Sequence, residues 1–425
     1  MNYTSELIDF IKKSPTAYHT VETVKEMLLS AGYTECSEKE LGSYSDGGRH
    51  FVIRNGTSII AFRGKCEGGF MICASHSDTP CFKVKSELSG NYLRASVEKY
   101  GGSIFYSWLD RPLSLAGRVV VKINGGISTR LVNIDKDVFT IPSVAIHFNR
   151  GVNDGYKFNP AVDLIPLAGA ASSSGRLMDE VAEILGVDKS DIISHDLFLY
   201  NRECGRVIGL GDEFLLAPRL DDLGCVYSSV RAFLDADDTN GSVPVLAVFD
   251  NEEVGSETKQ GAASTFLDMT LSAIAGGEEK YRASLVDSFM ISADNAHAVH
   301  PNHPELSDPG NAPILGGGVV VKYNANQRYT TDAVSDALFR SFADRCGIKL
   351  QSYYNRADML GGSTLGSISN TSVSVKTVDI GLPQLAMHSS VETVACSDIC
   401  DMVSVMKEFY SSGIDCKGSD VKIKN

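Results

Sequence analysis

The sequence contains no apolar run long enough to cross a bilayer, which takes roughly 20 consecutive apolar residues in a helix. It is also short of basic residues, because 39 lysines and arginines stand against 53 aspartates and glutamates and leave a formal net charge of −14. Such a surface does not attract the phosphates of nucleic acids or of an anionic membrane. Neither a membrane nor a nucleic acid is therefore expected as a partner.

The ten cysteines lack the spacing of a disulfide or metal-binding framework, since they are scattered over 425 residues without a CxxC pair. A secretory signal is not expected either. The first twenty residues, MNYTSELIDFIKKSPTAYHT, carry acidic residues inside the apolar stretch and a proline at position 15. This segment is predicted to form the first helix, and reduced thiols in a cytoplasmic protein are the expectation.

The chain is longer than the roughly 250 to 300 residues at which a single hydrophobic core stops growing. From about Leu88 to Leu216 it consists of short β-rich runs with glycine turns, interrupted by one possible helix at 175–185. We therefore predict an inserted β-rich domain at 88–216. The remaining residues, 1–87 and 217–425, then form a discontinuous second domain.

Outside the insertion, strand and helix patterns alternate. Helical spacing begins with an amphipathic helix at 21–29, and Asn55-Gly56 is a strong signal for a hairpin between strands at 51–54 and 58–62. The later elements are apolar strands at 69–74, 243–249 and 289–293, and helices at 220–233 and 332–346. This alternation predicts an α/β fold with three layers, α/β/α, around a central, mostly parallel sheet.

Histidines and acidic residues stand where the predicted strands end. His76 and Asp78 follow the strand at 69–74, and Asp294 follows the strand at 289–293. The other members of this set are Glu252 and Glu253 after the strand at 243–249, Asp221 and Asp222 at the start of a helix, and His388 in the run LAMHSS. In parallel α/β sheets, ligands bind outside the carboxyl ends of the strands. These positions therefore predict a functional site.

The chemistry of this set favours divalent cations. Several carboxylates at one place repel one another unless cations neutralise them, and imidazole and carboxylate oxygen are ligands that zinc accepts. Two ions that share one carboxylate can hold a water and lower its pKa, while a further carboxylate acts as general base. Each residue alone has a simpler explanation, such as a packed histidine or an acid at a helix N-terminus. The joint occurrence is what indicates a two-metal site.

The segment HAVHPNH offers a competing metal site, with His297, His300 and His303 at a spacing of three. Pro301 and Pro304 would break the helix that is needed to align these side chains. A further metal at this segment is not expected.

Six segments carry a resemblance to a known family. HSDTPCFKVK, PRLDDLG, NEEVGSETKQGA, SADNAHAVHPN, NQRY and PQLAMHS resemble the signature segments of the aspartyl aminopeptidases and occur in the same order, from His76 to about Glu392. The resemblance implies a metalloaminopeptidase that removes the N-terminal residue of peptides. The chain departs from the family pattern at Gly361, where many relatives have cysteine, and at SSVET, which replaces an Arg-Glu ending. Both departures concern the shape of the substrate pocket.

The resemblance also implies a role for each member of the strand-end set. His76 and Asp294 would hold one zinc, Glu253 and His388 the other, and Asp221 would bridge them. Glu252 would be the general base on the metal-bridging water, and Asp78 would orient the ring of His76 through its other nitrogen. Manganese or cobalt are alternatives to zinc.

Substrate contacts and assembly are implied in the same way, with residues 1–87 and 217–425 as the catalytic domain and residues 88–216 as the assembly domain. His297, Lys322 and Tyr329 match positions that contact substrate, and His147 matches a histidine that reaches into the site of a neighbouring subunit of a homododecamer. Lys322 would favour acidic N-terminal residues, although a lysine on an edge strand is ordinarily only solvated. The alternatives are an aminopeptidase of broad or neutral specificity, a related two-zinc amidase or deacylase, and a non-enzymatic assembly protein.

Overall fold

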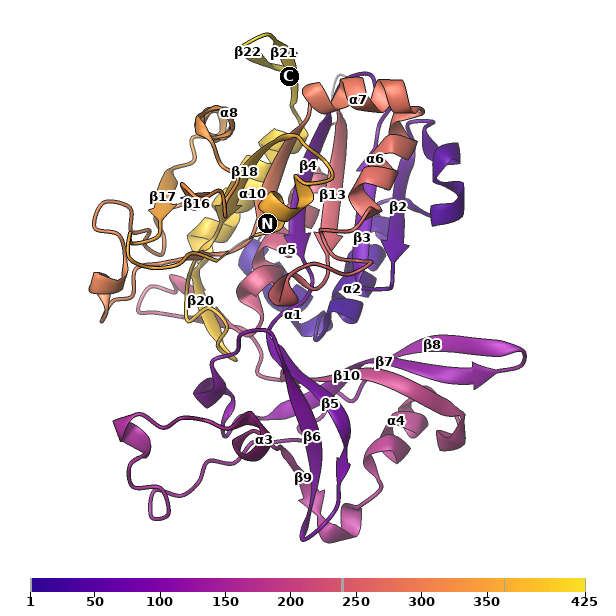
Figure 1. Ribbon diagram of the computed structural model, residues 1–425, viewed down its shortest axis with the longest axis vertical. Helices are drawn as coiled ribbons and strands as arrows, with labels where there is room; N and C mark the ends of the chain where they lie inside the picture. The colour runs from indigo at the N-terminus through magenta and orange to yellow at the C-terminus, as the bar shows by residue number, and fades with distance from the viewer. Residues whose placement is uncertain (1, 238–240, 363, 425) are drawn as a thin grey trace.

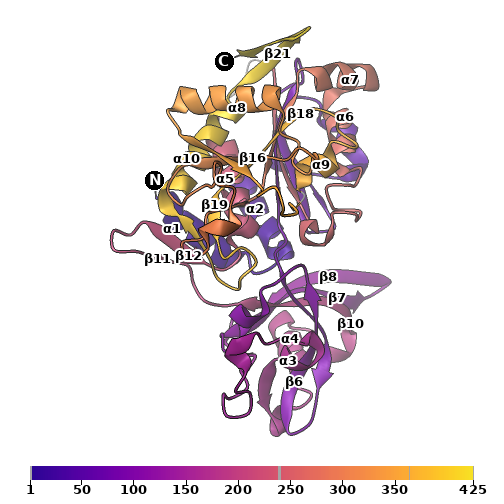
Figure 2. The same cartoon turned by 60° about the vertical axis from the view of Figure 1, so that its left-hand side comes forward.

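The computed structural model describes residues 2–237, 241–362 and 364–424, and these form two lobes (Figures 1 and 2). The large lobe surrounds a nine-stranded sheet, and the small lobe contains a six-stranded sheet. Among the described residues, no helix combines the length and the apolar character that a membrane crossing requires.

The nine-stranded sheet has the order β1-β2-β3-β13-β4-β14-β18-β16-β17. Its four central neighbours, β13, β4, β14 and β18, run parallel to one another. The strands are β1 (Thr34–Cys36), β2 (Arg49–Arg54), β3 (Ser58–Arg63), β4 (Phe70–His76), β13 (Val243–Phe249), β14 (Phe289–Ala293), β16 (Val319–Tyr323), β17 (Leu350–Tyr354) and β18 (Lys376–Gly381). The predicted central, mostly parallel sheet is confirmed.

Helices cover both faces of this sheet (Figure 1). Side chains alternate between the two faces of a strand, so Met71 and Cys73 of β4 join one core while Phe70 and Ile72 join the other. The first core includes α1 (Tyr3–Lys13), α2 (Ala17–Ser30), α5 (Leu220–Asp235), α8 (Ala333–Cys346) and α10 (Cys396–Tyr410); the second includes α6 (Phe266–Ala275), α7 (Glu278–Val286) and α9 (Leu365–Ser369). The three-layer α/β/α arrangement is confirmed.

Local sequence signals explain where several elements begin and end. The β2–β3 hairpin turns at Asn55 and Gly56, whose φ angles of 59° and 75° are those that an Asn-Gly turn favours. Helix α8 begins after Asp332, which accepts hydrogen bonds from the backbone N–H groups of Val334 and Ser335. The predicted strands at 243–249 and 289–293 coincide with β13 and β14.

The small lobe has its own core and a sheet in the order β8-β7-β10-β5-β6-β9. Its elements are β5 (Cys81–Leu88), β6 (Tyr92–Tyr100), β7 (Leu113–Ile123), β8 (Gly126–Asn133), β9 (Leu167–Ala170), β10 (Ile192–Asn201), α3 (Pro160–Asp163) and α4 (Leu177–Leu185). The sheet therefore takes in residues 81–87, which were predicted to belong to the catalytic domain. Strand β5 follows β4 after a short polar turn, and no change of composition marks the boundary between the two lobes there.

The end of the predicted insertion also belongs elsewhere. Strands β11 (Arg206–Ile208) and β12 (Phe214–Ala217) join a five-stranded sheet with β15 (Ala296–His297), β19 (Pro383–Leu385) and β20 (Glu392–Ala395). A C-terminal hairpin, β21 (Gly413–Lys417) and β22 (Asp420–Lys424), completes the chain's regular elements. The division at 88 and 216 remains a proposal about domains, while the strands of the inserted sheet itself lie between Cys81 and Asn201.

Candidate metal centre

The candidate site lies at the carboxyl ends of the central strands. His76 is the last residue of β4, and its neighbours β14 and β13 lead directly to Asp294 and to Glu252. Asp221 lies in the first turn of α5, and His388 lies in the loop between β19 and β20. Because parallel neighbours end at the same sheet edge, strands that are far apart in sequence bring these side chains together.

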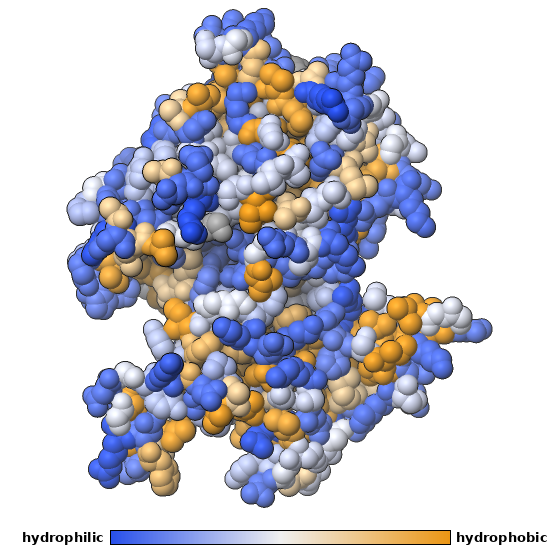
Figure 3. All heavy atoms as spheres, in the orientation of Figure 1, coloured by the Kyte–Doolittle hydropathy of each residue, from blue (hydrophilic) through white to orange (hydrophobic). Residues whose placement is uncertain are grey.

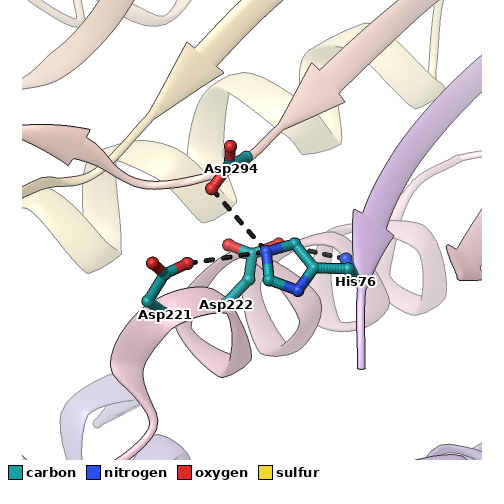
Figure 4. Close-up of side chains that lie close together, drawn as sticks. All are labelled: His76, Asp221, Asp222 and Asp294. Carbon is teal, nitrogen blue, oxygen red and sulfur yellow. Dashed lines mark hydrogen bonds and ion pairs between the residues drawn. The ribbon is translucent and has the colours of Figure 1, made fainter. Parts of the chain in front are cut away.

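One cluster surrounds the ring of His76 (Figure 4). Its Nε2 atom lies 3.5 Å from Asp221 Oδ1, 3.7 Å from Asp294 Oδ1 and 4.0 Å from Asp222 Oδ2. The ligand atoms of these four residues all lie within 4.8 Å of one another. Asp222 also accepts a hydrogen bond from the backbone N–H of His76 at 3.1 Å.

A second cluster surrounds the ring of His388. Its Nε2 atom lies 3.4 Å from Asp221 Oδ2 and 3.4 Å from Glu253 Oε2. Asp221 therefore presents one carboxylate oxygen to each of the two imidazoles. This is the arrangement expected of a residue that is shared by two ions. A further group of possible ligands consists of His76, Glu252 and Glu253.

Both histidines carry a proton on Nδ1, the ring nitrogen opposite the one that faces Asp221. His76 Nδ1 lies 3.0 Å from the backbone carbonyl oxygen of Asp78, and His388 Nδ1 lies 3.2 Å from that of Gly102. A carbonyl oxygen only accepts, so each Nδ1 donates and each Nε2 is left to face the carboxylates. This orientation is typical of histidines that bind metal through Nε2.

The donor set fits divalent cations. Asp221 Oδ1, Asp222 Oδ1 and Glu253 Oε1 are buried oxygens without a hydrogen-bond partner among the described residues. A buried carboxylate oxygen without a partner is costly, and a cation bound by these oxygens and the two Nε2 atoms would remove that cost. His76, Asp221, Asp222 and Asp294 could hold one ion, and Asp221, Glu253 and His388 could hold the other.

The charges of the cluster shift the pKa values of its members. Burial and the repulsion by neighbouring acids raise the pKa of Glu252 to about 8, although His76 opposes the shift. Burial alone would raise the pKa of Asp221, but its contacts with His388 and His76 hold it below the ordinary value. Burial lowers the pKa of His388, and Asp221 and Glu253 outweigh it and raise the pKa to about 10. A bound cation would counter these protonations.

Asp78 connects the two halves of the site. Its Oδ1 accepts the backbone N–H of Glu252 at 3.1 Å and lies 3.5 Å from His76 Nδ1. Its Oδ2 accepts the backbone N–H of Glu253 at 3.2 Å. Asp78 therefore fixes the loop that carries both glutamates as well as the ring of His76.

The predicted substrate contacts occupy different environments. Lys322 is buried, because β16 is an interior strand between β18 and β17 and not the edge strand of the simpler explanation. Its ammonium lies 5.1 Å from the centre of the Tyr329 ring. The ring of His297 lies 6.0 Å from that of Tyr353, and the surrounding protein and the charge of Lys322 lower its pKa. His147 is exposed in the small lobe and is not among the residues that converge on the cluster.

Comparison with known proteins places this site in a family. The family model of the aminopeptidase I zinc metalloproteases (M18) matches residues 10–410. The chain belongs to the M18 family. It is 41% identical over 429 residues to a probable M18 family aminopeptidase 2 of Clostridium novyi, which covers 97% of this chain and 99% of the relative. This M18 chain is thus a hydrolase of the exopeptidase class, and the predicted metalloaminopeptidase identity is confirmed.

Solved structures agree with the assignment. The M18 chain is similar to a chain of the Ape4 and Nbr1 complex, with a TM-score of 0.92, 35% identity and coverage of 96% of this chain and 85% of that one. It is similar to the mApe1 dodecamer of S. cerevisiae with a TM-score of 0.83 and 28% identity, covering 96% of both chains. Family membership favours an aminopeptidase over the amidase and the non-enzymatic assembly protein.

Two residues of the M18 centre were not among the predicted site residues. Glu392, buried in β20, accepts the backbone N–H of Asp221 at 3.0 Å and that of His388 at 2.7 Å, and so holds two members of the cluster. Asp222 was noted as a neighbour of Asp221 and was not assigned a role. An acid four residues after the predicted ligand His388 was the available signal for Glu392, and the segment SSVET was interpreted only as a departure from the family pattern.

His300 and His303 of the segment HAVHPNH make contacts of their own. The rings of His300 and His303 lie 5.2 Å apart, and His303 pairs with Glu305 at 3.1 Å. Of the residue groups in the described chain that could hold an ion, none includes His297, His300 or His303. That no further metal is bound at this segment stays a prediction.

Proposed function

We propose that this M18 aminopeptidase removes acidic N-terminal residues from peptides and that Glu252 is its general base. The observation that carries the proposal is the place of Glu252. Asp78 accepts the backbone N–H of Glu252. The Glu252 carboxylate forms a group with His76 and Glu253 whose ligand atoms lie within 4.8 Å of one another, and this group includes neither Asp221 nor His388. A carboxylate beside the ligand cluster, and outside the two groups that contain Asp221, is free to exchange protons.

Two divalent ions, with zinc as the first choice, would be held by the two groups that share Asp221. When bound, they supply positive charge that polarises the scissile carbonyl and favours ionisation of water. The carboxylates of the cluster also attract the free α-ammonium group of a peptide. That attraction selects the chain end and explains an exopeptidase.

Glu252 carries the proton through the reaction. Its carboxylate accepts a proton from water while the water oxygen forms a bond to the carbonyl carbon. As the bond between that carbon and the peptide nitrogen breaks, the protonated Glu252 gives the proton to the nitrogen, which leaves as an amine. The residue ends as a carboxylate, ready for the next turnover.

Lys322 is our candidate for recognition of an acidic side chain. Its ammonium donates to the backbone oxygen of Asp294 at 2.7 Å, and to Asp294 Oδ2 and the backbone oxygen of Asn295 at 3.3 Å each. A substrate carboxylate would take one of the two longer contacts. Burial lowers the pKa of Lys322, but Asp294 and other neighbours outweigh it, so the ammonium stays charged.

Replacing Lys322 by methionine should change specificity and not only rate. The ratio of kcat/KM for an aspartyl substrate to that for a leucyl substrate should fall by roughly ten- to a hundred-fold, as expected when a charged hydrogen bond of about 1.5–3 kcal/mol is lost. The exposed Lys349→Met is the matched control. An equal loss on both substrates would mean that Lys322 only holds Asp294 in place.

We further propose that the protein forms a dodecamer and that His147 enters a neighbouring site. The mApe1 structure of S. cerevisiae is a dodecamer. The loop around His147 exposes Val144, Ile146 and Phe148, the last to 88%. Apolar side chains also gather on the β7–β8 hairpin (Figure 3), where Ile127 is exposed. Exposed apolar surface of this kind marks an interface.

Replacing Phe148 by aspartate should separate the subunits. A charge in the apolar contact would reduce the particle from about twelve times the 45.8 kDa of one chain to a small oligomer, as light scattering would measure. Activity should fall with it, since His147 would no longer reach a neighbour. Val286→Asp, which changes an exposed residue of α7 at the far end of the large lobe, should leave particle size unchanged. An intact dodecamer of the Phe148 variant would contradict the proposal.

A further inference from the structure

The strand end where the inserted lobe meets the metal cluster forms one wall of the site. We call residues 100–104, which begin at the last residue of β6, the Tyr100 segment. The carbonyl of Gly102 accepts from His388 Nδ1 at 3.2 Å, and the backbone N–H of Ile104 donates to the His388 carbonyl at 2.9 Å. The inserted lobe thereby fixes both the place and the tautomer of His388.

The same segment packs against Glu253. Gly101 has a φ of +69°, and a Cβ placed there would lie 3.1 Å from the Cβ of Glu253 and 3.3 Å from its Oε2. Only glycine allows the backbone of the inserted lobe to approach this carboxylate so closely. Two members of the second cluster, Glu253 and His388, are therefore in contact with the inserted lobe.

The side chain that precedes these glycines reaches Asp78, which lies beside His76 of the first cluster. The Tyr100 hydroxyl donates to Asp78 Oδ2 at 2.7 Å and accepts from Asn251 Nδ2 at 2.8 Å. Asp78 in turn accepts the backbone N–H groups of Glu252 and Glu253. Tyr100 thus supports the catalytic loop twice, through the carboxylate that binds its N–H groups and through the amide of Asn251 that begins it.

We propose that Tyr100 is a positioning residue for hydrolysis, through which the inserted lobe holds the loop of Glu252 and Glu253 at the metal cluster. The inference rests on the proposed role of this loop, and it makes the inserted lobe a part of the catalytic centre in addition to any role in assembly. The phenol suits this task because burial and the charge of Asp78 raise its pKa, which keeps the donated proton on Tyr100.

A cavity lined by Tyr100 allows an effect on loop position to be distinguished from an effect on folding. This space of about 390 Å³ is lined by Tyr18, Asp78, Tyr100, Phe198 and other residues of both lobes. Water from the cavity can replace a missing hydroxyl at Asp78, and the ring of Tyr100 would still contact Phe198, whose ring centre lies 5.9 Å away. Loss of the hydroxyl should therefore disturb the orientation of the loop that carries Glu252 and Glu253 and change the free energy of unfolding only slightly.

Tyr100→Phe tests the proposal, with Tyr18→Phe as the matched control. Tyr18 lines the same cavity and also donates its hydroxyl to a carboxylate, Asp196 Oδ2, at 3.2 Å, and among the described residues this hydroxyl has no hydrogen bond to the catalytic loop. At saturating zinc, Tyr100→Phe should lower kcat by about 10- to 100-fold with KM within about three-fold, the usual effect of removing a residue that orients metal ligands. Tyr18→Phe should stay within about two-fold of the parent enzyme.

Amide hydrogen exchange supplies a readout that does not depend on turnover. The N–H groups of Glu252 and Glu253 should exchange faster in Tyr100→Phe and at the parent rate in Tyr18→Phe. Equal kcat and equal exchange in the two variants would overturn the role of Tyr100. If Glu252→Gln kept full activity while Tyr100→Phe still showed slower turnover and faster exchange, the assignment of the base would fail and the role of Tyr100 would stand.

Discussion

Glu252→Gln should lower kcat by about a thousand-fold and leave the fold and the metal content unchanged. Glutamine keeps the size of the side chain and the backbone hydrogen bond to Asp78, but its amide cannot accept the proton of the attacking water. Turnover of an aspartyl peptide under single-turnover and steady-state conditions would separate the chemical step from product release.

The matched control for this variant is Glu257→Gln. Glu257 is exposed in the same loop, so the control makes the same chemical change close by and should retain full activity. Zinc analysis and thermal unfolding of both variants would show whether the site is intact. A Glu252 variant that binds zinc normally and turns over at more than about a tenth of the parent rate would exclude this residue as the base.

Asp221→Asn should reduce the amount of bound metal and lower the activity by more than about 10⁴-fold. The two oxygens of Asp221 lie 3.5 Å from His76 Nε2 and 3.4 Å from His388 Nε2, so this carboxylate belongs to both candidate ion sites. Asparagine offers one oxygen and no charge, and its amide N–H groups would face a cation or the Nε2 atom of a histidine. The measured zinc per chain should fall from two to one or fewer.

Stability gives an independent measure of the same substitution. Ligand that binds only the folded chain raises the unfolding temperature, so zinc should stabilise the parent protein and have a much smaller effect on the Asp221 variant. Asp344→Asn, on the exposed side of α8, should respond to zinc as the parent does. Two bound zinc ions in the Asp221 variant would contradict a shared ligand.

The parts of the fold that could be predicted are those with strong local patterns. Continuous apolar runs located β4, β13 and β14, and the residues at or just beyond their carboxyl ends, His76, Glu253 and Asp294, converge at one sheet edge. The rule that ligands bind at the carboxyl ends of parallel strands needs only the strands and their order along the chain. For this reason the candidate metal ligands were the part of the site that could most readily be predicted from the sequence.

The remaining features depend on which segments become neighbours in space. Lys322 lies in a strand whose sequence does not show that β17 and β18 flank it on both sides. Glu392 acts through backbone N–H groups of other segments, and such contacts leave no periodic pattern. Tyr100 belongs to the inserted lobe, and its partner Asp78 is known only after both lobes are placed. Composition likewise could not locate the start of the inserted sheet at Cys81.

The position of β4 in the large sheet sets the order in which the enzyme can mature on the ribosome. Both edges of β4 pair with strands made after the inserted lobe, β13 and β14, and His76 precedes Asp222 by 146 residues. A nascent chain can complete the smaller lobe, whose strands are nearly consecutive, while β4 still waits for its partners. The cluster can thus be completed only after His388 has been synthesised, close to the end of the chain.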